Sequence, residues 1–174
     1  DRRSALNPHT RTAMTFPPRI ALVLVGLASS ASVAMALYAQ HRMGMEPCPW
    51  CILQRMVFIV IAVVAWLAAL QPWQGLRRAL SGLVVLLCGA GVAAAWWQHA
   101  VAAKSSSCAL TLADKIISAV GVDTRWPDVF EVRASCADGA VDLWGVPFEL
   151  WSLALFAALG LIAVLCTVTR SRRA

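Results

Sequence analysis

The sequence has little charge for its length. Only 14% of its 174 residues are Asp, Glu, Lys or Arg, whereas 60% are hydrophobic. A soluble domain of this size cannot bury so large an apolar fraction, so a soluble globular protein is excluded. Internal repeats and low-complexity tracts are also missing from the sequence, which argues against repeat arrays and biased disordered segments. The composition therefore predicts an integral membrane protein.

Metal ligands are also scarce. The chain has three histidines and a single CxxC, Cys48 to Cys51, with no second CxxC and no paired histidine spacing. Metal binding by this pair, with His41 or His99 as further ligands, is therefore the weaker interpretation, and we expect no metal site. The net charge of +6 does not indicate a nucleic-acid partner either, because the basic residues flank the apolar runs.

Four apolar runs are long enough to span a membrane. A hydrocarbon core of ~30 Å needs roughly 20 mainly apolar residues per helix. Short connections make consecutive spans antiparallel neighbours, and small residues such as Gly26 and Gly91 permit close helix approach. These features predict an all-α, polytopic membrane protein with a bundle of four transmembrane helices. The four runs are residues 20–38, 52–70, 80–97 and 150–168.

The chain is expected to form one membrane domain over residues 14–174. Residues 1–13 precede Met14 and are expected to be a disordered or non-native extension that contributes nothing to the fold. Two loops, residues 40–49 and 99–149, emerge on one side of the membrane.

The distribution of arginine predicts the orientation in the membrane. Arginines precede the first span, lie between the second and third, and follow the fourth, so these ends should face the cytoplasm. Both termini are then cytoplasmic, and the cysteine-bearing loops face the periplasm or its equivalent. A cleavable signal peptide is the alternative for the first span, although its apolar run is longer than usual. The arginines concerned are Arg2, Arg3, Arg11, Arg19, Arg77, Arg78, Arg170, Arg172 and Arg173.

The long loop contains one helix signal. Thr111 followed by Asp114 has the pattern of an N-cap and a capping residue, and an apolar stripe runs from there to Gly121. This pattern predicts a short amphipathic helix, which either lies among the lipid headgroups or packs on the bundle. The stripe comprises Leu112, Ile116, Ile117 and Val120.

The six cysteines fall into two groups. Cys88 and Cys166 lie inside apolar spans, where a free cysteine behaves as a small hydrophobic residue. The other four, on the periplasmic side of the predicted topology, are Cys48, Cys51, Cys108 and Cys136. An oxidising compartment favours two disulfides among them, which are either structural or redox-active.

Cys48 and Cys51 would make a poor structural disulfide, because closing so small a ring removes little entropy from the unfolded chain. Cys51 begins the second span, where the helix dipole favours a thiolate. Cys108 and Cys136 could form a purely structural disulfide. However, thiols pass electrons by direct exchange, so a loop pair beside a membrane-edge pair suggests a route from a soluble protein to a lipid-phase acceptor.

Two further residues are expected at this level of the membrane. Arg55 lies four residues after Cys51, on the same helical face, and a charge inside a span marks either a site or a contact with headgroups. The site interpretation has Arg55 holding the Cys51 thiolate and a carbonyl of the acceptor. His99 ends the third span beside Trp96 and Trp97, and is either part of this site or part of an interfacial belt.

The sequence resembles the disulfide bond formation protein B (DsbB) family, the quinone-coupled oxidases of bacterial inner membranes. The likeness runs from about Phe16 to Arg173 and combines several motifs, which together are specific. One departure is Val141, where family members often carry a tryptophan after the second loop cysteine; Trp144 lies nearby. The motifs are the CxxC with Arg55, His99, the loop cysteines Cys108 and Cys136, and the segment LWGVPFELW over residues 143–151.

This resemblance implies a partner and an acceptor. The partner would be a periplasmic thioredoxin-fold oxidase of the DsbA type, and the acceptor ubiquinone or menaquinone. Cys108 would take the partner's thiolate, and Cys136 would then attack Cys48. Cys51 would be released to contact a quinone held near Arg55 and His99.

Two other classes remain as alternatives. The vitamin K epoxide reductase type also pairs a CxxC with loop cysteines, but places the CxxC in its last span, whereas here it opens the second. A structural membrane protein with inert disulfides is the non-enzymatic alternative, and it predicts disulfides that resist exchange.

Overall fold

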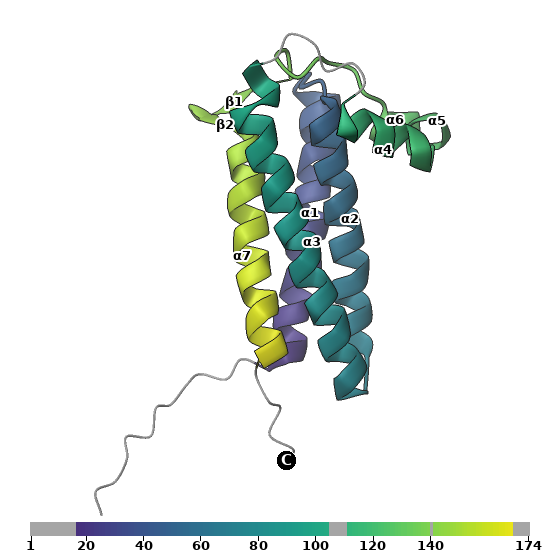
Figure 1. The fold of residues 1–174 in the computed structure, drawn as a ribbon, viewed down its shortest axis with the longest axis vertical. Helices are drawn as coiled ribbons and strands as arrows, with labels where there is room; N and C mark the ends of the chain where they lie inside the picture. The colour runs from purple at the N-terminus through teal and green to yellow at the C-terminus, as the bar shows by residue number, and fades with distance from the viewer. Residues whose placement is uncertain (1–16, 105–110, 140, 169–174) are drawn as a thin grey trace, which may run out of the picture.

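The computed structural model describes residues 17–104, 111–139 and 141–168. Four long helices run side by side as an elongated bundle (Figure 1), and each is long and apolar enough to cross a membrane. This architecture confirms the predicted four-span, all-α fold. The helices are α1 (Pro18–Arg42), α2 (Pro49–Leu70), α3 (Gln74–Ala100) and α7 (Phe148–Val168).

The helices extend beyond the predicted spans. α1 continues to Arg42 and α3 begins at Gln74, because polar residues at a membrane surface can prolong a helix that hydropathy alone ends at the hydrocarbon boundary. Proline occupies the first turn of α1 and of α2, where its missing N–H leaves no helical hydrogen bond unmade.

The two ends of the bundle carry different residues. α1 starts and α7 stops at the same end, together with the turn between α2 and α3 (Figure 1). At the opposite end, which we call the cysteine end, α2 begins directly after Cys48 and α3 finishes at Ala100. The connections between α1 and α2 and between α3 and α7 both lie there.

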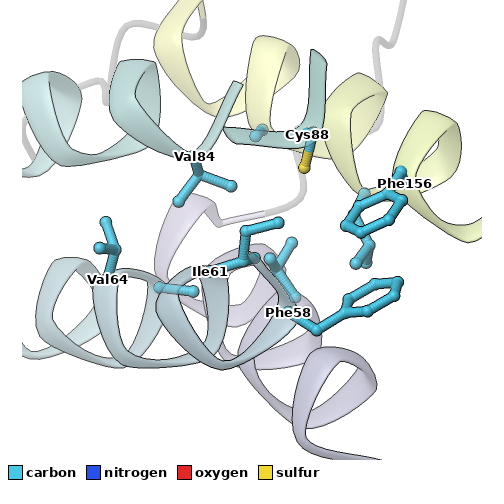
Figure 2. Packing of buried hydrophobic residues seen from close by; sticks show 10 residues of the cluster. Phe58, Ile61, Val64, Val84, Cys88 and Phe156 are labelled. Atoms are coloured by element: carbon cyan, nitrogen blue, oxygen red, sulfur yellow. The ribbon is translucent and has the colours of Figure 1, made fainter. Parts of the chain in front are cut away.

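Packing in the middle of the bundle depends on aromatic stacking and on one glycine. Phe58 of α2 and Phe156 of α7 stack with ring centroids 3.9 Å apart (Figure 2). A Cβ atom on Gly91 would lie 2.5 Å from the Phe156 ring, so α3 can approach α7 only because this residue has no side chain. Cys88 is buried in this same core, and Cys166 in a second apolar cluster with Leu22.

The long connection extends sideways from the cysteine end, beside α2 (Figure 1). It comprises a 3-10 turn over Ala102–Lys104 and three short helices, α4 (Leu112–Val120), α5 (Val122–Arg125) and α6 (Pro127–Phe130). The predicted amphipathic helix is confirmed as α4, whose N-terminus has the expected capping box between Thr111 and Asp114. We call α4 to α6 the lateral arm.

A small hairpin, absent from the sequence-based prediction, precedes α7. β1 (Asp142–Leu143) pairs antiparallel with β2 (Val146–Pro147). Both residues of its tight turn have positive φ, 55° at Trp144 and 77° at Gly145. Glycine adopts this conformation freely, but tryptophan does so at a cost, so the hairpin holds Trp144 in a strained position.

Candidate redox site and cavity

Cys48 and Cys51 face each other at the start of α2. Cys48 is the N-cap residue, and its sulfur accepts the backbone N–H of Cys51 at 3.3 Å. The two Sγ atoms are 2.8 Å apart, and both cysteines are free thiols. Cys48 is completely buried, whereas Cys51 is partly exposed.

The surroundings of Cys48 favour its protonated form. Its hydrogen bond with Cys51, and then its burial, raise the pKa of the Cys48 thiol above its ordinary value. Cys48 therefore keeps its proton, which it can donate in a hydrogen bond to the Cys51 sulfur. Of the two sulfurs, Cys51, at the helix N-terminus, is the one suited to act as a thiolate.

The second loop brings Cys136 against this pair. Cys136 is buried in the same cluster as Cys48 and Trp50, and it is disulfide-bonded. The backbone N–H groups of Arg133 and Ala134 donate to the Pro47 carbonyl, at 3.1 Å and 3.3 Å. The backbone itself thus fixes the Cys136 segment beside Cys48.

A glycine makes this approach possible. A Cβ atom on Gly139 would lie 2.8 Å from the Cys48 Cβ atom and 3.3 Å from the Cys48 backbone nitrogen. Any side chain at this position would therefore displace Cys48 or the loop. The remaining predicted redox residue, Cys108, lies outside the described residues.

A cavity of 680 Å³ opens next to Cys51. Most of its wall is apolar, and α1 and α7 contribute side chains such as Val33, Ala36 and Leu155. Its polar lining includes side chains that converge near the cysteine end, namely Cys51, Gln54, Arg55, Gln98 and Glu149. An apolar pocket with a few convergent polar groups is the usual form of a small-molecule site.

Two glutamines link Cys51 to α3. The Gln98 side-chain N–H donates to the Cys51 sulfur at 3.3 Å, and Gln54 donates to the Gln98 side-chain oxygen at 2.6 Å. Both glutamines are buried. Neither glutamine could be identified from the sequence, because a single glutamine in a span gives no indication of its distant partner. The only available signal was the energetic cost of a polar side chain in an apolar environment.

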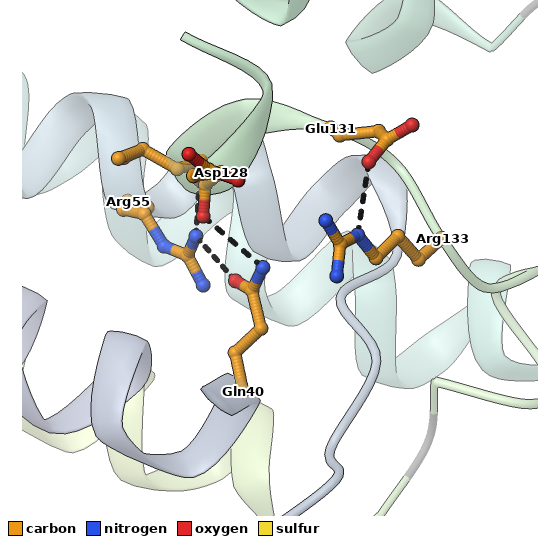
Figure 3. A network of polar contacts seen from close by, with 6 residues as sticks. Gln40, Arg55, Asp128, Glu131 and Arg133 are labelled. Atoms are coloured by element: carbon orange, nitrogen blue, oxygen red, sulfur yellow. Dashed lines mark hydrogen bonds and ion pairs between the residues drawn. The ribbon is translucent and has the colours of Figure 1, made fainter. Parts of the chain in front are cut away.

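Arg55 is buried and connects the bundle to the lateral arm (Figure 3). Its guanidinium donates to the Gln40 side-chain oxygen at 2.8 Å and to the Val129 carbonyl. Gln40 donates in turn to the Asp128 carbonyl at 3.3 Å. Among the described residues, Arg55 forms no ion pair with a carboxylate, and its Nε atom is buried without a hydrogen-bond partner.

The structure thus places Arg55 in the cavity wall with Cys51, as the sequence suggested, but gives it different partners. Its hydrogen bonds go to Gln40 and to the arm, while the Cys51 sulfur receives the amide of Gln98. Arg55 can therefore act on Cys51 through its charge, without a direct hydrogen bond.

His99 does not line the cavity itself and reaches it only through Glu149. Its Nδ1 atom is 3.0 Å from the Glu149 carboxylate, and its side chain is 37% exposed. Glu149 lines the cavity, whereas His99 does not. Glu149 could not be identified as a site residue from the sequence, because its partner His99 lies 50 positions away.

Val141 stands where the resemblance leads us to expect a tryptophan, and Trp144 lies three residues later. Both residues line the cavity. The strained turn presents Trp144 with 85% of its surface exposed, edge-on to Trp151 with ring centroids 6.0 Å apart.

Within residues 17–104, 111–139 and 141–168, no three His, Cys, Asp or Glu side chains converge as metal ligands would.

The sequence is similar to known proteins over most of its length. The family described as Disulfide bond formation protein DsbB matches residues 18–166. Disulfide bond formation protein B of Nitrosomonas europaea is 33% identical over 156 residues, covering 88% of this chain and 95% of that protein. The protein of the same name from a Polaromonas species is 35% identical, covering 90% of this chain and 94% of that protein. The one from Ralstonia nicotianae is 32% identical, covering 89% and 97%.

Proposed function

The chain belongs to the DsbB family of membrane disulfide bond formation proteins, and on that basis we propose that it oxidises a DsbA-type dithiol protein and passes the electrons to a membrane quinone. The observation that carries this proposal is the contact between the two cysteine sites. Cys136 and Cys48 belong to one buried cluster, and Cys51 lines the adjacent cavity.

The proposed route has two exchanges and one transfer. A thiolate of the partner attacks the Cys108 sulfur of the loop disulfide and displaces Cys136 as a thiolate. The partner's second thiolate then attacks the mixed disulfide, which releases the oxidised partner and leaves Cys108 and Cys136 reduced. Cys136 next attacks Cys48, which re-forms the loop disulfide and reduces Cys48 and Cys51. The membrane-edge pair returns to its disulfide by giving two electrons to the quinone.

The cavity has the chemistry that a quinone requires. Apolar side chains of α1 and α7 would surround the ring and its tail, and the buried guanidinium of Arg55 would donate to a ring carbonyl. The unpaired Nε atom of Arg55 fits this assignment, because a buried donor needs a partner. His99 would contribute through Glu149, and either ubiquinone or menaquinone has the carbonyls concerned.

The proposed setting is the bacterial inner membrane. The arginine-bearing ends would face the cytoplasm and the cysteine end the periplasm, where the soluble partner is found. Both termini would then be cytoplasmic. The lateral arm would lie near the membrane surface, since exposed Leu112, Val120 and Trp126 give it an apolar face.

Filling the cavity should separate the quinone step from the thiol exchanges. Ala36→Trp adds an indole to the cavity wall, so quinone reduction by the pre-reduced protein should fall by about 10-fold or more, on the expectation that steric exclusion removes a bound ligand. Capture of a reduced DsbA-type partner should stay within a few-fold of the parent. Stopped-flow quinone absorbance and non-reducing gels measure the two steps.

The matched control is Ala34→Trp, which adds the same side chain to an exposed position of α1 that is not part of the cavity wall. It should leave both steps within a few-fold of the parent. Equal quinone reduction in the Ala36 and Ala34 variants would show that the quinone does not use this cavity.

A further inference from the structure

A buried carboxyl group lines the same cavity as the Cys51 sulfur. Glu149, in the first turn of α7, is 3% exposed, and one of its oxygens is 3.0 Å from His99 Nδ1. Its other oxygen, Oε2, is buried and has no hydrogen-bond partner among the described residues. A half-paired carboxyl group is costly in such a place, so its presence at the wall of a ligand cavity indicates a functional role.

His99 connects this carboxyl group to the surface. Its side chain is 37% exposed and lies beside Trp96, with ring centroids 6.3 Å apart. Imidazole gains and loses a proton near neutral pH, and its two nitrogens can face different partners. One nitrogen of His99 contacts Glu149, which leaves the other available to exchange protons with water.

The proposed reaction requires a proton from outside the cysteine pair. Cys48 retains its proton, whereas Cys51 acts as the thiolate. Oxidising one thiol and one thiolate to a disulfide releases two electrons and one proton. A quinone takes up two electrons and two protons on becoming a quinol, so one proton is still missing.

Few groups in the cavity can supply that proton. The amides of Gln54 and Gln98 do not titrate, and the Arg55 guanidinium does not release a proton in proteins. Besides Cys51 and Arg55, the titratable groups lining the cavity among the described residues are Glu46 and Glu149, and α1 contributes none. Glu46 is exposed and lies on the loop before α2, whereas Glu149 combines burial, an unpaired oxygen and a proton-exchanging partner.

We propose that Glu149 is the general acid that delivers the second proton to the quinone oxygen, and that His99 returns a proton to Glu149 from the loop side. This inference rests on the proposed function. It adds a catalytic residue, Glu149, and a relay residue, His99, which acts through it.

The first test is single-turnover quinone reduction by the pre-reduced full-length protein. Glu149→Gln keeps the shape but has no acidic proton, so quinol formation should slow by about 100-fold or more, the usual contribution of a general acid. Because glutamine carries no acidic proton, the pH profile of this variant should differ from that of the parent. Glu149→Asp keeps an acid and should recover part of the rate.

The matched control is Asp142→Asn, which makes the same chemical change at an exposed residue outside the cavity wall, seven positions earlier on the segment that leads into α7. It should leave the rate and its pH profile unchanged. Partner capture should also be unchanged in all three variants, which shows that they are folded.

The second test needs no quinone. On transfer to deuterated water, the carboxyl infrared band that is lost in Glu149→Gln should exchange its proton, and His99→Gln should slow this exchange at least several-fold. Exchange at the parental rate in the His99 variant would overturn the relay. A Glu149→Gln rate within a few-fold of the parent, or a slower rate with an unchanged pH profile, would overturn the general acid. Failure of the parent itself to reduce quinone would instead contradict the proposed function.

Discussion

Replacing Cys136 with serine should stop electron flow and trap the partner on the enzyme. The serine cannot re-form the loop disulfide, so Cys108 stays a free thiol. When the oxidised partner is added, this thiol attacks the partner's disulfide, and the mixed disulfide should accumulate because Cys136 is no longer present to displace the partner. The Cys136 segment is held beside Cys48 by two hydrogen bonds to Pro47 and by the close approach of Gly139, so the variant loses the thiol that lies next to Cys48. Non-reducing gels should show the adduct, and steady-state quinone reduction should fall to background.

The control for this experiment uses the two cysteines in the middle of the bundle. Cys88 and Cys166 are buried in apolar clusters away from the cavity, so replacing both with alanine should leave turnover within a few-fold of the parent. Normal turnover in the Cys136 variant, or total loss in a folded Cys88 and Cys166 variant, would contradict the proposed order of exchanges.

Replacing Arg55 with leucine should weaken quinone reduction by about 100-fold or more, the cost typical of removing a preorganised donor from an active site. The change removes the only charged donor among the described residues of the cavity wall. Capture of the partner on Cys108 should remain largely intact. Single-turnover quinone absorbance and the gel assay distinguish the two steps.

Two controls separate the charge of Arg55 from its contacts with the lateral arm. Gln40→Leu breaks the neighbouring hydrogen bonds but keeps the cation, so quinone reduction should fall much less. Arg133→Leu removes an exposed arginine whose ion pair with Glu131 (Figure 3) should contribute little. An Arg55 variant that fails to capture the partner, yet reduces quinone normally from a small dithiol, would reverse the assignment of the two cysteine pairs.

Local sequence signals were sufficient for much of this architecture. The spans follow from apolar runs of membrane length, and α4 follows from the capping pattern of Thr111 and Asp114, because each signal is contained within a few turns of helix. The position of Cys48 and Cys51 at the start of α2 follows from the boundary of the second run.

The features that escaped prediction depend on residues far apart in the chain. Gln54 and Gln98 become a pair only when α2 packs on α3, and the role of Glu149 becomes visible only when α7 brings it to His99. The partners of Arg55 lie on α1 and α6, so its sequence neighbours suggested only Cys51.

The hairpin was missed for a different reason. A turn with two positive φ angles favours glycine or asparagine, and Trp144 at the first position gives the opposite signal. Hydropathy likewise joins the hairpin to the polar loop before it. The position of Trp144 in the cavity wall therefore could not be predicted from the number of residues that separate it from Cys136.

The most direct test of the central claim is a coupled reaction between the purified full-length protein, a reduced DsbA-type partner and a soluble quinone. We expect one quinol to form for each disulfide formed in the partner, and we expect the reaction to need all four of Cys48, Cys51, Cys108 and Cys136. Oxidation of the partner without consumption of quinone would contradict the account. So would disulfides that stay unreactive toward the reduced partner, as expected of a purely structural membrane protein.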